Sequence, residues 1–108
     1  MLGAIIGDIS GSRFEWDNQK SKDFELLTYH CDPTDDSNMT LAIARALLLC
    51  DGDWSSLAQH AVECMRDFGK KYTHGYGGRF REWLMSDSPE PYGSWGNGSA
   101  MRSEEHTV

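Results

Sequence analysis

The chain has 108 residues, of which 10 are Lys or Arg and 17 are Asp or Glu, so its formal net charge is −7. This length accommodates one domain, and a hydrophobic fraction of 39% with four Trp argues against an intrinsically disordered chain. The acidic charge argues against a binder of duplex nucleic acid, which needs clustered Lys and Arg. It suits a site for a cation or a small molecule, although solubility alone would account for most of it.

The cysteines and the apolar segments indicate a location. The three cysteines are an odd number without a Cys-x-x-Cys pair, which predicts free thiols in a reducing cytoplasm. The longest apolar stretch, Leu41–Cys50, is too short to span a bilayer, so no membrane segment is expected. Met1–Ile9 contains Asp8 and no basic residue, and it therefore does not have the pattern of a signal peptide.

The first predicted element is a helix from Met1 to about Ile9, because its apolar residues recur at helical spacing. A short buried strand is the alternative, since periodicity alone does not separate the two. Gly11–Pro33 is polar and mixed, and it predicts a long loop with a helical turn near Ser21–Leu27.

Two stronger helices follow. Small oxygen-bearing side chains at Thr34–Ser37 precede an apolar-periodic run, which predicts a capped helix from about Asp36 to Cys50 that stops at Asp51–Gly52. A second apolar stripe predicts a helix from Trp54 to about Phe68, with Asp53 as its cap and Gly69 as its stop. Together they predict an αα-hairpin.

The remaining chain carries weaker signals. Tyr72–Gly78 is rich in Gly and aromatic residues and predicts a loop, and Arg79–Met85 predicts a short helix with Phe80, Trp83 and Leu84 facing inward. Ser86–Ser99 predicts irregular structure. Because no segment favours a strand over a helix, the expected fold is all-α.

Thr34, Asp35 and Asp36 are the first candidate site. Two adjacent carboxylates and a hydroxyl are the hard oxygen ligands that Mg²⁺ or Mn²⁺ prefers. The alternative is helix capping, since acidic residues also suit the positive end of a helix dipole. Spacing alone favours capping, but two adjacent carboxylates cannot both cap one helix equally well, which keeps the metal hypothesis open.

Two other segments are weaker candidates. Glu15 follows an apolar segment on a loop, where it could act as a general base or simply be a solvated charge. Gly93–Arg102 is a Gly-rich stretch whose backbone N–H groups could contact a phosphate, although it matches neither a P-loop nor a G-x-G-x-x-G motif and an ordinary loop is the alternative. Aromatic residues between Tyr72 and Trp83 could stack on a base or pack in the core.

Read together and in order, these segments resemble the ADP-ribosylglycohydrolase family. The chain has a G-A-x-x-G-D-x-x-G-S-x-x-E segment at Gly3–Glu15 and a T-D-D-[ST]-x-M-T segment at Thr34–Thr40. A segment with Tyr-Gly, Arg-Phe and Trp in that order follows at Tyr76–Trp83, and a G-N-G-[SG]-A-M-R loop lies at Gly96–Arg102. The four motifs span almost the whole chain.

The resemblance implies an all-α fold with a binuclear Mg²⁺ or Mn²⁺ site in a cleft. It implies hydrolysis of the glycosidic bond that joins ADP-ribose to a protein side chain or a related acceptor. By position, the metal ligands would be Thr34, Asp35 and Asp36. Glu15 would be a catalytic or substrate-gating carboxylate, and the residues along the diphosphate and ribose would be Asn97, Gly98 and Ser99.

The chain also departs from the family pattern. Asn38 stands where a small apolar residue such as Val is usual, and no D-x-D-[ST] motif, which supplies the other metal ligands in the family, is present. We therefore expect residues 1–108 to be the N-terminal part of the family domain, weak or inactive alone. Its expected partner is a second copy or a complementary C-terminal part. The alternative is a non-catalytic helical module that binds ADP-ribose or a partner and oligomerises.

Overall fold

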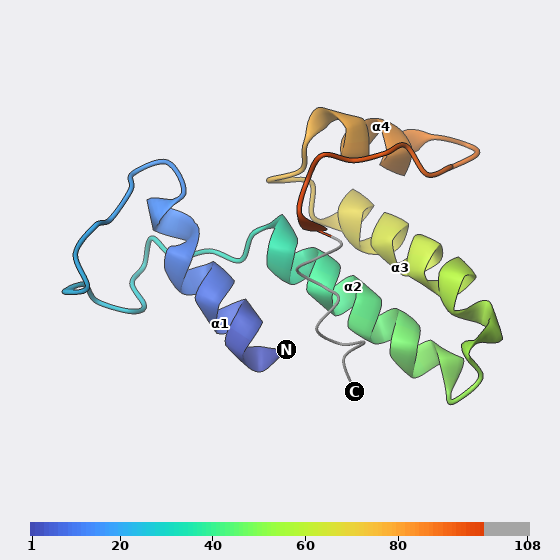
Figure 1. Cartoon of the computed structure of the whole chain (residues 1–108), viewed down its shortest axis with the longest axis horizontal. Coiled ribbons are helices and arrows are strands. Elements are labelled where there is room, and N and C mark those ends of the chain that lie inside the picture. The colour runs from blue at the N-terminus through green and yellow to red at the C-terminus, as the bar shows by residue number, and fades with distance from the viewer. Residues whose placement is uncertain (99–108) are drawn as a thin grey trace.

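The computed structural model describes residues 1–98, which are helical and contain no strand (Figure 1). The four α-helices of this part are α1 (Leu2–Gly11), α2 (Asp35–Cys50), α3 (Leu57–Lys71) and α4 (Gly78–Met85). Two 3₁₀ turns are also present: η1 (Ser12–Phe14) directly follows α1, and η2 (Trp54–Ser56) directly precedes α3. The predicted all-α fold is confirmed. In this part of the chain, no helix is long and apolar enough to cross a membrane.

Helices α2 and α3 form the predicted hairpin, which is the centre of the structure (Figure 1). Ala42 and Ala46 of α2 are fully buried and pack against Cys64 of α3, and these small side chains let the two helices approach closely. The link bends at Asp51 and Gly52, both with positive φ, and the Asp53 side chain accepts a hydrogen bond from the Ser55 N–H at 3.1 Å. The stop and the cap were both predicted.

Helix α4 covers the end of this hairpin. Leu84 is 4% exposed and packs with Met39 and Tyr76 in a second buried cluster. The Arg66 guanidinium donates to the Ser86 carbonyl at 2.6 Å, which ties the end of α4 back to α3. The prediction that Gly69 stops α3 is wrong: the helix continues to Lys71, and Gly69 is buried where the Leu84 side chain lies against it. Gly69 therefore serves helix packing and does not end the helix.

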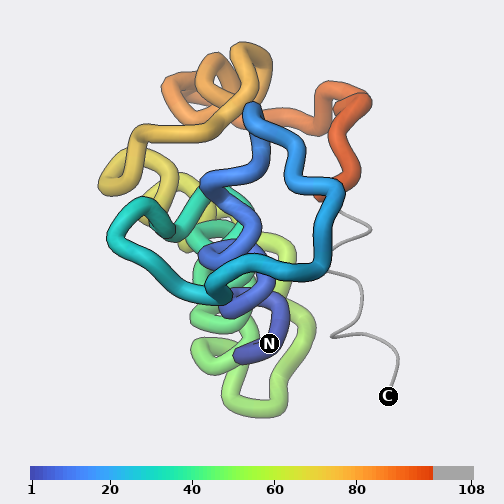
Figure 2. The backbone as a smooth tube through the Cα atoms, turned by 90° about the vertical axis from the view of Figure 1, so that its left-hand side faces the viewer, coloured from blue at the N-terminus to red at the C-terminus, as the bar shows by residue number. Residues whose placement is uncertain are grey.

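The segment between α1 and α2 is a wide loop, as predicted (Figure 2). Its helical turn lies at Ser12–Phe14, and the turn expected near Ser21–Leu27 is absent from the structure. Arg13 organises the loop: its guanidinium lies 4.5 Å from the Phe14 ring centroid and 5.9 Å from that of Phe24. It also donates to the Thr28 hydroxyl at 2.9 Å. One side chain at the start of the loop thus fixes residues far along it.

Candidate functional site

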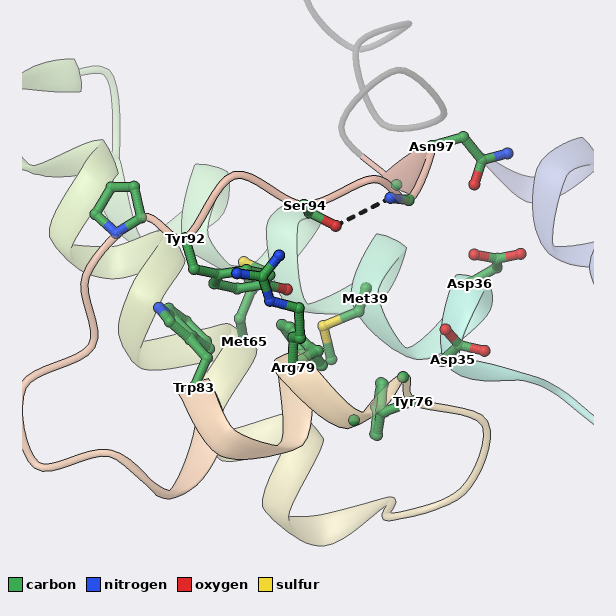
Figure 3. Close-up of a pocket in the computed structure, with 16 residues that line it drawn as sticks. Asp35, Asp36, Met39, Met65, Tyr76, Arg79, Trp83, Tyr92, Ser94 and Asn97 are labelled. Carbon is green, nitrogen blue, oxygen red and sulfur yellow. Dashed lines mark hydrogen bonds between the residues drawn. The ribbon is translucent and has the colours of Figure 1, made fainter.

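A cleft of about 730 Å³ opens between the N-terminal end of α2, the start of α4 and the segment 91–98 (Figure 3). Asp35 and Asp36 lie at one end of it, and Trp83 and Tyr92 lie at the other. The cleft therefore combines an acidic end with an aromatic wall, within the size range of small-molecule sites.

The acidic end is built by the start of α2. The Thr34 hydroxyl accepts a hydrogen bond from the Asp36 N–H at 3.2 Å, so Thr34 caps the helix. Asp35 and Asp36 occupy the first turn, where the helix dipole favours negative charge. All three residues are half-buried. The predicted position of this triplet at a helix start, with partly accessible side chains, is confirmed. Of the three residues, Thr34 is the one that caps the helix.

Asp8 of α1 holds this helix start from the side. Its Oδ1 accepts the Thr34 hydroxyl at 2.5 Å, and its Oδ2 accepts the Ser37 hydroxyl at 2.5 Å. Oδ2 also accepts the backbone N–H groups of Thr34 at 2.9 Å and Ser37 at 3.3 Å. Sequence analysis assigned Asp8 no role. The signal that could have found it is a lone charged residue in the otherwise uncharged segment Leu2–Gly11.

These hydrogen bonds also shift the acidity of Asp8. Partial burial by itself raises the pKa of this carboxyl, but the hydrogen bonds from Ser37 and Thr34 outweigh it and hold the pKa below its ordinary value of 3.8. The ionised form is thus the one that the fold stabilises.

A pH dependence of stability follows for Asp8. Because its pKa is lower in the folded than in the unfolded chain, its stabilising contribution is complete above about pH 4 and is lost as pH falls through the lower, folded value. Thermal unfolding of the wild type and of Asp8→Asn across this range tests it. The difference in Tm between them should be largest near neutral pH and should shrink in acid. A difference that stays constant with pH would contradict the assignment.

Gly75 lies against Asp35. It has a φ of +89°, and a Cβ at this position would come within 2.6 Å of the Asp35 Oδ1. Glycine is therefore needed here both for the left-handed backbone and for the space beside the carboxylate. The next residue, Tyr76, is 4% exposed and packs into the core with Met39, which anchors the loop beside α2.

The aromatic wall comes from α4 and the segment after it. Phe80 and Trp83 are stacked, with ring centroids 5.5 Å apart, and Tyr76 lies 5.1 Å from Phe80. The Arg79 guanidinium lies 5.6 Å from the Tyr92 ring centroid. Sequence analysis left core packing and stacking open for these aromatic residues. Tyr76 is buried in the core and Trp83 is half-buried, and both also line the cleft.

The structure brings together only part of the predicted site. Asp35, Asp36, Asn97 and Gly98 all line the cleft. Thr34 caps α2 beside them but is not among the lining residues. Glu15, exposed on the loop after η1, is not among them either, and Ser99 lies outside the described residues. Among residues 1–98, no group of three or more His, Cys, Asp or Glu side chains is arranged to hold a metal ion.

The chain was compared with known proteins. A sequence profile of the family described as ADP-ribosylglycohydrolase matches residues 1–105. No curated protein and no solved structure matches the chain. Because the profile covers nearly the whole sequence, the chain belongs to the ADP-ribosylglycohydrolase family, whose members are hydrolases and generally depend on a metal.

Proposed function

We propose that this chain forms one side of a site that hydrolyses the glycosidic bond between ADP-ribose and a protein side chain or related acceptor. The observation that carries the proposal is the pair of carboxylates at one end of a cleft of about 730 Å³ with an aromatic wall at the other. A cleft of this size and lining suits a ligand that has hydroxyl groups or a bound cation at one end and a flat ring at the other.

The acidic end suits a divalent cation by the chemistry of its donors. Asp35, Asp36 and the Thr34 hydroxyl offer hard oxygen atoms, which Mg²⁺ or Mn²⁺ prefers. A bound ion there would polarise the reacting centre and lower the pKa of a water. The described residues supply too few carboxylates for two ions. We therefore propose that residues 1–108 act as the N-terminal part of the family domain. The remaining ligands would come from a complementary part or a second copy.

The other proposed roles follow the family pattern. The Asn97 amide and the N–H groups of Gly98 and Ser99 would donate to the diphosphate and ribose, which suits a Gly-rich segment. Glu15 is proposed as a catalytic or substrate-gating carboxylate. Its exposed place on the loop after Arg13 requires the loop to move toward a bound substrate.

Calorimetric titration of ADP-ribose, with and without millimolar Mg²⁺, tests the site. We expect binding that strengthens with Mg²⁺ and that Asp36→Ala weakens by about tenfold or more, the loss of one charged ligand contact. Asp53→Ala is the control, because Asp53 is likewise an acidic residue at the start of a helical element but does not line the cleft. Equal affinities for wild type and Asp36→Ala would contradict the proposal.

Turnover tests whether the chain alone carries a complete site. In millimolar Mg²⁺, the chain alone should hydrolyse ADP-ribosyl-arginine and ADP-ribosyl-serine peptides very slowly or not at all. The reason is that the acidic end of the cleft offers too few ligands to hold two metal ions. Fast turnover that is lost in Asp35→Ala and Asp36→Ala would show that the chain completes a full site, by itself or by self-association.

The alternative is a non-catalytic module that binds ADP-ribose or a partner and oligomerises. Exposed apolar side chains on the first two helices favour it, because Leu2 is 76% exposed and Leu48 is 81% exposed. Sedimentation at micromolar concentration distinguishes the states: an oligomer that binds ADP-ribose without Mg²⁺ supports the module. Free thiols at Cys31, Cys50 and Cys64 support a reducing cytoplasm as the proposed location.

A further inference from the structure

The Thr34 hydroxyl, on the residue directly before Asp35 and Asp36, donates its proton in one defined direction. An ionised carboxylate only accepts hydrogen bonds, so the Thr34 hydroxyl must donate its single proton to Asp8 across the 2.5 Å contact. The Thr34 oxygen also accepts the Asp36 N–H at 3.2 Å. With its proton and one lone pair committed, the oxygen keeps its second lone pair as an acceptor and cannot donate to another group.

We propose that Asp8 is a positioning residue that fixes the Thr34 hydroxyl as an acceptor for a divalent cation beside Asp35 and Asp36. This inference rests on the proposed metal site. Asp8 acts through Thr34: its Oδ2 already accepts three hydrogen bonds, from Ser37 Oγ and from the N–H groups of Thr34 and Ser37. Hydrogen bonding from a ligand to a carboxylate behind it also increases the basicity of the ligand atom.

The same contacts place a third negative charge behind the acidic end without using it as a ligand. Asp8 reaches α2 from a different helix, and its contacts fix both the cap residue and the residue three positions later. A cation at this end would thus meet oxygen atoms whose orientation is set before it binds. The Thr34 side chain is already ordered in the folded chain, so binding of a cation would not lose its conformational entropy.

The test is Mn²⁺ affinity of the full chain, measured by electron paramagnetic resonance of free Mn²⁺. Asp8→Asn should weaken binding by about 10- to 100-fold, the usual effect of removing a partner of a metal ligand. Ser37→Ala is the matched control: it removes one 2.5 Å hydrogen bond to Asp8 but leaves the Thr34 contact, and its affinity should stay near that of wild type.

A double-mutant cycle separates positioning from a general structural effect. Thr34→Val removes the hydroxyl while keeping the shape of the side chain. If Asp8 acts through Thr34, Asp8→Asn should cause little further loss in the Thr34→Val background, and the two effects should be strongly non-additive. Thr34→Ser, which retains the hydroxyl, should rescue most of the affinity. Additive effects, or unchanged affinity in Asp8→Asn, would overturn the inference.

Failure of the metal site itself gives a different result. Wild-type affinity no higher than that of an Asp35→Asn, Asp36→Asn double variant would overturn the proposed site together with the inference. Loss of affinity in Asp36→Asn with none in Asp8→Asn overturns the inference alone. If Asp8→Asn unfolds, side-chain coupling constants of Thr34 in the metal-free wild type decide. A single χ1 rotamer is expected, and rotamer averaging would contradict the fixed hydroxyl.

Discussion

Replacing Gly75 by Ala is expected to weaken divalent-cation binding by about tenfold or more, the scale seen when a metal ligand loses its positioning. The added Cβ would lie within 2.6 Å of the Asp35 Oδ1 and within 3.3 Å of its backbone nitrogen, so the carboxylate has to move. The φ of +89° adds a backbone cost of about 1–2 kcal/mol for a residue with a side chain. Mn²⁺ titration and denaturant unfolding measure the two effects separately.

Gly52→Ala is the matched control for the backbone cost. Gly52 has the same φ of +89°, but a Cβ there meets nothing within 4 Å. We expect Gly52→Ala to lose similar stability while Mn²⁺ affinity remains unchanged. If both variants bind Mn²⁺ as wild type does, Gly75 does not position Asp35 for a cation.

Leu84→Ala is expected to be the most destabilising of the substitutions considered, by about 2–5 kcal/mol. Leu84 is 4% exposed, fills the space above Gly69 and packs with Met39 and Tyr76. Its loss leaves a cavity where α4 joins the hairpin, and ADP-ribose affinity should fall as well because α4 carries Trp83 of the cleft wall. Urea unfolding measures the stability.

The neighbouring residue provides the comparison for Leu84. Met85 is 74% exposed at the end of α4, and Met85→Ala should change the free energy of unfolding by no more than about 0.5 kcal/mol. Equal losses for Leu84→Ala and Met85→Ala would show that α4 does not depend on this contact.

Local signals predicted the helices well. The caps at Thr34 and Asp53 and the bend at Asp51 and Gly52 depend on residues close in sequence, and all were found. The prediction for Gly69 was wrong because a glycine after an apolar stripe is also the usual local signal for the end of a helix. In the structure its role is set by Leu84, a contact that only the packing of α4 creates.

The site was predictable where its residues adjoin one another and not where it spans the chain. Asp35 and Asp36 stand together at a helix start, and Asn97 and Gly98 stand in one Gly-rich segment; all four line the cleft. Asp8 reaches Thr34 from a separate helix, and no spacing rule links them. Glu15 remains a prediction, since its role depends on a loop movement that sequence pattern does not specify.

The fully buried Ala42 and Ala46 of the hairpin have a consequence for how the cleft keeps its shape. Their side chains have no rotamers to change, and their contact with Cys64 sets how closely α2 and α3 lie. The position of Asp35 relative to the loop after α3 therefore depends on the contact of Ala42 and Ala46 with Cys64, and these residues do not line the cleft. Larger residues at positions 42 and 46 would push α2 and α3 apart. They would thereby shift the acidic end of the cleft without changing any residue that lines it.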